Sequence, residues 1–172
     1  MPSSRILIAS NTLGSAAASV TFSSIPSTYT DLVLRVTGRT DVAAVNDGLA
    51  IRFNGGTSGY SRTAVVGTGS GAASGRNSNQ SYALPYDEIN GNNATASSFG
   101  SQELYIPSYT SSNSKPFSSF GAGETNAATA YMGADALLSN LTSAITSISI
   151  IPSNGANFLS GSSFFLYGIK NS

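Results

Sequence analysis

The stretch Phe22-Ser-Ser-Ile-Pro-Ser-Thr-Tyr-Thr-Asp-Leu-Val-Leu-Arg-Val-Thr-Gly-Arg-Thr40 decides how the rest of the chain is interpreted. From residue 32 its side chains alternate with a period of two, which is typical of a β-strand. One face would be apolar and comprises Leu32, Leu34 and Val36. The opposite face would carry Asp31, Val33, Arg35 and Thr37. Because a proline restricts the residue before it to extended geometry, we expect a corner at Ile25-Pro26 between two strands.

The chain closes on a second apolar stretch, Phe158-Leu-Ser-Gly-Ser-Ser-Phe-Phe-Leu-Tyr-Gly-Ile-Lys170. One face of this expected strand comprises Phe165, Tyr167 and Ile169. The other face comprises Phe164 and Leu166. A strand that is apolar on both faces is buried on both, either in the centre of a sandwich or against another subunit.

The pattern predicts a candidate subunit interface, formed by outward residues of these two strands. They comprise Phe165, Tyr167, Ile169 and Arg35. Arg39 follows at the exit of the first stretch. We expect both arginines to contact the next strand or a second subunit rather than a small ligand.

The composition indicates one folded β domain spanning residues 1–172, since all-β folds of this size commonly stay single. Charged residues make up 9% of the chain, against about a quarter in a typical globular protein. Disordered chains are usually charge-rich and poor in aromatic residues. This chain has 8 Phe and 8 Tyr, so a folded β protein with uncharged polar loops fits better.

Short alternating segments recur along the whole chain at spacings near ten residues. Besides the two stretches above, the expected strands are 4–9, 18–23, 49–53, 60–66, 101–109, 114–121, 128–138 and 143–151. Residues 67–80 are rich in Gly, Ser and Asn, so we predict a flexible exposed loop there. About eight to ten short strands without a helical period predict an all-β, antiparallel β-sandwich of jelly-roll-like type.

Charge and targeting features exclude several partners. The formal net charge is zero and the eight basic residues are scattered, so we expect no nucleic-acid binding. The apolar run Ile6-Leu7-Ile8-Ala9 is too short for the core of a signal peptide, so secretion by such a signal is not expected. No run approaches the roughly 20 apolar residues that a membrane helix needs, so we expect no membrane association.

The chain lacks His and Cys, which removes the common catalytic triads and zinc sites. We therefore predict no catalytic, metal or cofactor-binding residues and no enzymatic activity. The alternative is a glycosidase, whose two carboxyls lie about 5–10 Å apart. Asp87, Glu88 and Glu103 are the candidates for such a pair, although they fit equally well as loop acids and an outward strand residue.

Tyrosines near Asn and Asp residues suggest a second alternative, a carbohydrate-binding surface. The tyrosines concerned are Tyr60, Tyr82, Tyr86, Tyr105 and Tyr109. Aromatic faces beside polar groups suit sugars, but the same residues fit an ordinary core or protein interface.

Several segments together resemble a family of tailed-bacteriophage virion proteins. They are the stretch 22–40, Ile51-Arg-Phe-Asn-Gly-Gly56, Ala144-Ile-Thr-Ser-Ile-Ser-Ile150 and Asn157-Phe-Leu-Ser-Gly-Ser-Ser-Phe-Phe-Leu-Tyr-Gly-Ile169. The resemblance covers the first third and the last quarter of the chain, and it is loose over residues 67–138. The family often has a Trp shortly before the Ala-Ile-Thr segment, where this chain has Leu137 and Leu138.

The resemblance implies a jelly-roll structural subunit of the virion, such as a capsid decoration (cement), head-fibre or tail-associated protein. Its expected partners are further copies of itself, a trimer being favoured, and other virion proteins such as the major capsid protein. A host-surface glycan is a further possible partner. The resemblance also implies synthesis in the cytoplasm of a bacterial host and a final location in the virion. It carries over no catalytic motif and no cofactor.

Overall fold

The computed structural model describes residues 4–86, 88–126 and 130–170, and it is an antiparallel β-sandwich. No helix occurs within these ranges, and all ten pairings between named strands are antiparallel. The all-β sandwich predicted from the sequence is therefore confirmed. One layer is much wider than the other, and the candidate site lies on the wide layer.

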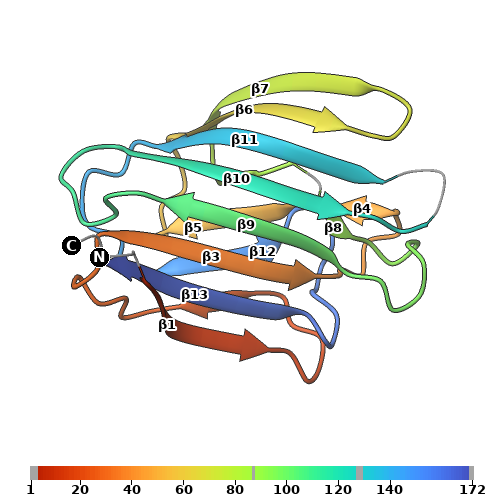
Figure 1. Cartoon of the computed structure of the whole chain (residues 1–172), viewed down its shortest axis with the longest axis horizontal. Helices are drawn as coiled ribbons and strands as arrows, with labels where there is room; N and C mark the ends of the chain where they lie inside the picture. The colour runs from red at the N-terminus through yellow and green to blue at the C-terminus, as the bar shows by residue number, and fades with distance from the viewer. Residues whose placement is uncertain (1–3, 87, 127–129, 171–172) are drawn as a thin grey trace.

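The wide layer is an eight-stranded sheet, which faces the viewer in Figure 1. In spatial order its strands are β1 (Ser4–Thr12), β13 (Ser163–Lys170), β3 (Asp31–Gly38), β9 (Gly100–Ile106), β10 (Lys115–Gly123), β11 (Tyr131–Ser139), β6 (Tyr60–Gly67) and β7 (Ala72–Gln80). Strands at one edge therefore come from both ends of the chain, because β13 lies between β1 and β3.

The narrow layer lies behind the wide sheet in Figure 1 and consists of two small sheets. The first contains β2 (Val20–Phe22), β12 (Ile148–Pro152) and β5 (Leu49–Phe53). The second contains the two-residue strands β4 (Asn46–Asp47) and β8 (Ile89–Asn90). Together they cover one face of the wide sheet, and no strand of the described residues forms a second layer over the opposite face.

The core fills the space between the layers and includes apolar residues of the opening and closing stretches. Leu34 of β3 pairs with Leu166 of β13, and neither side chain is accessible to solvent. Across the layer lie fully buried side chains of β5 and β12, namely Ile51, Phe53, Ile148 and Ile150. Burying each such side chain contributes about 1.5–3 kcal/mol, so the alternation in these strands dominates the fold.

Residues 67–80 differ from the flexible loop that their composition predicted. A tight turn closes with Thr68 N donating to the Gly71 carbonyl at 2.9 Å, and β7 then pairs along β6. The prediction was wrong because an edge strand needs only the backbone of its neighbour, and its small polar side chains stay in solvent.

The structure has thirteen strands within the described ranges, more than the eight to ten expected. Besides β7, the additional elements are the two-residue strands β4 and β8. The strand expected over 143–151 starts only at Ile148, although Ile145 before it is also buried. The strand expected over 128–138 is observed from Tyr131, and residue 128 lies outside the described residues.

Candidate functional site

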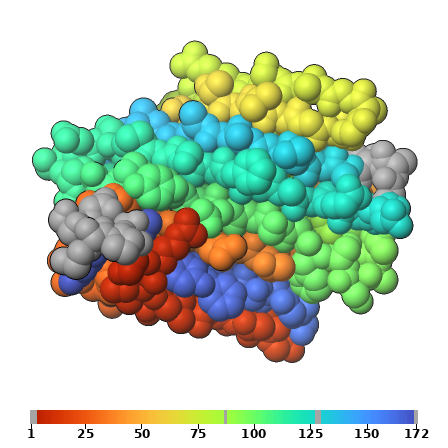
Figure 2. Space-filling view, in the orientation of Figure 1, coloured from red at the N-terminus to blue at the C-terminus, as the bar shows by residue number. Residues whose placement is uncertain are grey.

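The uncovered face of the eight-stranded sheet, called here the open face, is turned toward the viewer in Figure 2. Directly paired residues of antiparallel strands point to the same side, so the register assigns every side chain to a face. Phe120 of β10 pairs with Ala134 of β11, which pairs with Val65 of β6. All three side chains are on the open face and are exposed.

We call the outward side chains of β6, β10 and β11 the uncharged stripe. It comprises Ser61, Thr63, Val65, Pro116, Ser118, Phe120, Ala122, Met132, Ala134, Ala136 and Leu138. Four of these are large apolar residues with high exposure: Phe120 and Val65 at 56%, Met132 at 53% and Leu138 at 40%. No member carries a charge, although an open sheet face normally alternates polar outside with apolar inside.

The covered side of the same three strands carries buried polar groups beside the core residues Phe117, Leu137 and Tyr60. Lys115 has no accessible surface, and its ammonium donates to the carbonyls of Ser111, Asn113 and Leu141 at 2.7, 2.5 and 3.3 Å. Burial lowers the pKa of Lys115. Asp135 is also buried, and its carboxylate accepts a bond from the Ser119 hydroxyl at 2.9 Å. Burial raises the pKa of Asp135.

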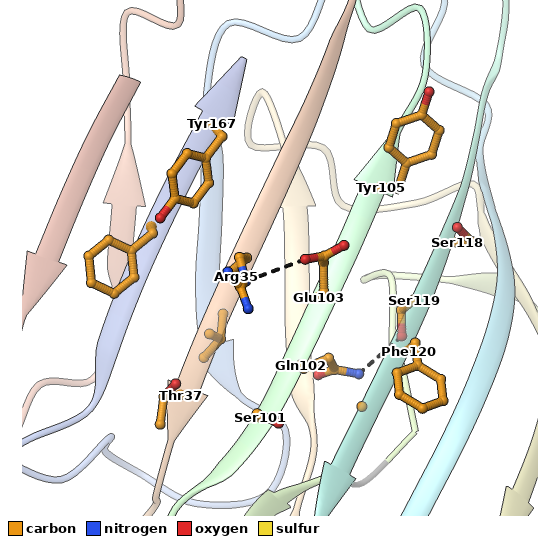
Figure 3. A pocket seen from close by; sticks show the side chains of 13 residues that line it. Arg35, Thr37, Ser101, Gln102, Glu103, Tyr105, Ser118, Ser119, Phe120 and Tyr167 are labelled. Atoms are coloured by element: carbon orange, nitrogen blue, oxygen red, sulfur yellow. Dashed lines mark hydrogen bonds and ion pairs between the residues drawn. The ribbon is translucent and has the colours of Figure 1, made fainter. Parts of the chain in front are cut away.

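The open face is hollowed over β13, β3, β9 and β10, and this hollow overlaps the stripe at Ser118 and Phe120 (Figure 3). The hollow has a volume of about 610 Å³. Its outward side chains are Arg35, Thr37, Ser101, Glu103, Tyr105, Ser118, Phe120, Phe165 and Tyr167. Figure 3 shows Tyr167 on one side of the Arg35–Glu103 pair, with Tyr105 and Phe120 on the other side. The hollow thus has a polar floor between aromatic walls.

An ion-pair cluster lies in the floor of this hollow. The Glu103 carboxylate accepts two bonds from the Arg5 guanidinium, at 3.0 and 3.1 Å, and lies 3.3 Å from Arg35 Nε. All three groups are partly exposed, so their mutual attraction contributes at most about 1 kcal/mol per pair. Tyr105 donates its hydroxyl to Asp31 at 2.8 Å, and this bond raises the pKa of Tyr105.

The residues predicted for a subunit interface all reach the open face, but they are unequally accessible. Phe165 and Tyr167 are half-buried, with ring centroids 6.4 Å apart in a stacked arrangement. Ile169 is only 8% exposed and offers little surface to a partner. The Arg35 side chain is 58% exposed and bridges to Glu103 on the neighbouring strand β9, as expected of a strand-to-strand contact.

Arg39 takes a different role from the one expected. Its guanidinium is buried and donates to the carbonyls of a single loop, at Asn92, Ala94, Thr95 and Ser98, over 2.8–3.0 Å. The expectation of a contact to the next strand or subunit was wrong because the side chain turns to its own chain's polar loop. Arg39 therefore orders residues 92–98.

The carboxylates considered for a glycosidase do not face one another. Glu103 is on the open face, whereas Glu88 is fully buried on the covered side, against Gly121 and Gly133. The sheet separates the two groups, so they cannot flank one sugar bond in the way a carboxylate pair requires. Asp87 lies outside the described residues.

Sequence reasoning missed a buried polar network around Glu88. Gln102 donates to Glu88 and also lies 3.1 Å from the Ser119 hydroxyl, which in turn donates to Asp135. Its only sequence signal was the glycines at 121 and 133 inside expected strands, since such glycines often mark a close approach of another group.

The five tyrosines proposed for a sugar surface do not come together. Tyr60 and Tyr109 are buried in the core, and burial raises the pKa of both. The Arg52 guanidinium lies 4.1 Å from the ring centre of Tyr82, and Tyr86 has Arg62 at 5.3 Å. Only Tyr105 of the five lines the hollow of the open face.

Within residues 4–86, 88–126 and 130–170, no group of three or more acidic, His or Cys side chains is placed to hold a metal ion. The described part of the chain also has no helix that is long and apolar enough to cross a membrane. No protein-family model matches the sequence, and comparison with curated proteins finds no match.

Proposed function

We propose that the protein is a non-enzymatic structural component of a tailed-phage virion, a capsid decoration or fibre subunit that self-associates and docks on the particle. The observation that carries this proposal is the open face, where a wide sheet exposes Phe120, Val65 and Met132 without a second layer. The resemblance of the opening and closing stretches to virion proteins supports the same assignment.

The open face favours an assembled protein over a free monomer. Soluble monomers rarely expose contiguous apolar patches larger than a few hundred Å², and such patches commonly mark protein contacts. A chain with a net charge of zero also has little electrostatic repulsion between copies. The proposed partners are further copies of the chain and other virion proteins, such as the major capsid protein.

Purified virions test this proposal directly. Mass spectrometry of gradient-purified particles should detect the chain at a fixed stoichiometry to the major capsid protein. A density map of the particle should contain the sandwich as an ordered subunit. Absence of the chain from purified particles would reject the assignment.

The hollow supports a second candidate function, a carbohydrate-binding module for a host-surface glycan. Its volume of about 610 Å³ is in the range of small-molecule sites, and aromatic walls with a polar floor suit a sugar. A glycan array with the purified wild-type protein tests this function, with Arg35→Ala and Phe120→Ala as variants expected to lose signal. No signal from the wild-type protein on any glycan would reject it.

A further inference from the structure

We propose that the uncharged stripe is the contact between copies of this chain, and that the partner presents the same stripe. The inference rests on the proposed function in one respect: it names the surface and the partner of the self-association. It also assigns the contact to β6, β10 and β11 rather than to the strand that carries Phe165 and Tyr167.

The apolar outward side chains of β10 and β11 are the first step of the argument. On the covered side, β10 and β11 bury Lys115, Ser119 and Asp135, and each polar group has to be paired because water is excluded. On the open side, the same strands expose Phe120 and Met132 to water. An isolated sheet gains little from this arrangement, whereas a sheet that is covered on both faces buries the apolar side chains as well.

The shape of the stripe suits packing of one sheet against another. Its large side chains, at positions 65, 120, 132 and 138, are interspersed with the small residues Ala122, Ala134 and Ala136. Ala134 lies between Phe120 and Val65 in the register. Facing sheets pack about 10 Å apart by interdigitating such large and small side chains.

The absence of charge on the stripe and the zero net charge of the chain suit a second copy as the partner. A contact in which the same patch is on both sides has to be complementary to itself. The uncharged stripe meets this condition, because no like charges would face each other. The hollow carries the charged side chains Arg35 and Glu103, so a copy would have to be aligned there with opposite charges facing each other.

A pair of matched variants tests the inference by analytical ultracentrifugation over a concentration series. Ala134→Glu places a charge at the centre of the stripe, on an exposed side chain that makes no core contact. Thr37→Glu places the same charge on the same open face, in the hollow on β3. We expect the wild-type protein to form oligomers, Ala134→Glu to weaken association at least tenfold, and Thr37→Glu to associate like the wild type.

Cross-linking provides a readout that does not depend on the stability of one variant. The chain has no Cys, so Ala134→Cys carries a single thiol, and a short bis-maleimide should join two copies through it. Thr37→Cys, as the control, should remain uncross-linked. Circular dichroism of each variant checks that the sandwich has folded.

Three outcomes would overturn the inference. One is a wild-type chain that stays monomeric at every concentration, and another is normal assembly of Ala134→Glu with no cross-link at Ala134→Cys. The third is equal dissociation by Thr37→Glu, which would extend the contact over the hollow. Mass spectrometry of virions is independent of all three, so a monomeric chain found in particles would refute this inference and leave the assignment to the virion standing without the self-association.

Discussion

Gly121 of β10 offers a sharp test of how the buried polar network is packed. A methyl group added at this position would point to the covered side of the sheet, where Glu88 is held. It would collide with the carboxylate of Glu88, and it would lie 2.8 Å from the Ser101 carbonyl oxygen and 2.9 Å from Glu88 Cβ. The Gly121→Ala variant therefore has to displace a buried side chain and a strand backbone together.

The magnitude follows from two opposing effects. Overpacking of this kind costs about 1–3 kcal/mol. Replacing glycine by alanine also restricts the unfolded chain, which stabilises the folded state by about 0.4–1 kcal/mol where the site is compatible. Because one of the displaced atoms belongs to the backbone of β9, we expect the strain to prevail. Gly121→Ala should lower the free energy of unfolding by about 1–2 kcal/mol.

Chemical unfolding followed by far-ultraviolet circular dichroism measures this change. Gly75→Ala is the matched control, because Gly75 also lies inside a strand, β7, but has no atom within 4 Å of the added methyl group. Its stability should be unchanged or slightly raised. If Gly121→Ala proves as stable as Gly75→Ala, the close packing of Glu88 on β10 is wrong.

Three further predictions concern buried polar groups. Arg39→Met should lower the free energy of unfolding in urea by about 2–4 kcal/mol, because four carbonyls lose a charged donor. The same variant should exchange backbone amide hydrogens faster in residues 92–98, and unchanged exchange there would contradict the prediction. Lys115→Met should cost about 2–4 kcal/mol, since it leaves three turn carbonyls without their ammonium partner, and an equally stable variant would count against that pairing. The raised pKa of Asp135 means that the folded chain holds this proton to higher pH than the unfolded chain, so stability from this group falls as pH rises above about 4. Asp135→Asn, beside Arg62, should flatten that dependence in denaturant titrations at several pH values, and an unaltered slope would refute it.

The layered core could be predicted from local sequence because its signal is periodic. Leu32, Leu34 and Val36 alternate with outward residues, and Phe164 and Leu166 do the same, so their burial followed from a period of two. The same rule placed Glu103 and Tyr105 on the opposite side of β9 from the core. In these strands one face packs against the core, so the alternation of side chains was sufficient to identify the buried residues.

The stripe and the network could not be predicted in this way because both depend on which strands become neighbours. Ala134 and Phe120 are unremarkable alone, and they form one surface only through the register of β10 with β11. Asp135 is a charged residue in a strand with an exposed face, yet it is buried because Ser119 of β10 and the Tyr86 amide, in the segment between β7 and β8, supply its partners. The edge strand β7 was missed for a related reason, since backbone pairing with β6 needs no apolar side chain.

The position of β13 between β1 and β3 has a consequence for folding on the ribosome. Since β13 follows all the other strands in the chain, β1 and β3 emerge first and remain without their shared neighbour until β13 has been synthesised. The same applies to β2 and β5, which are joined only by the late strand β12. Such non-local pairings slow folding, and unpaired strand edges are prone to aggregate in the meantime. Nascent chains that stop before β13 should therefore depend on chaperones, whereas chains that include β13 can close both sheets.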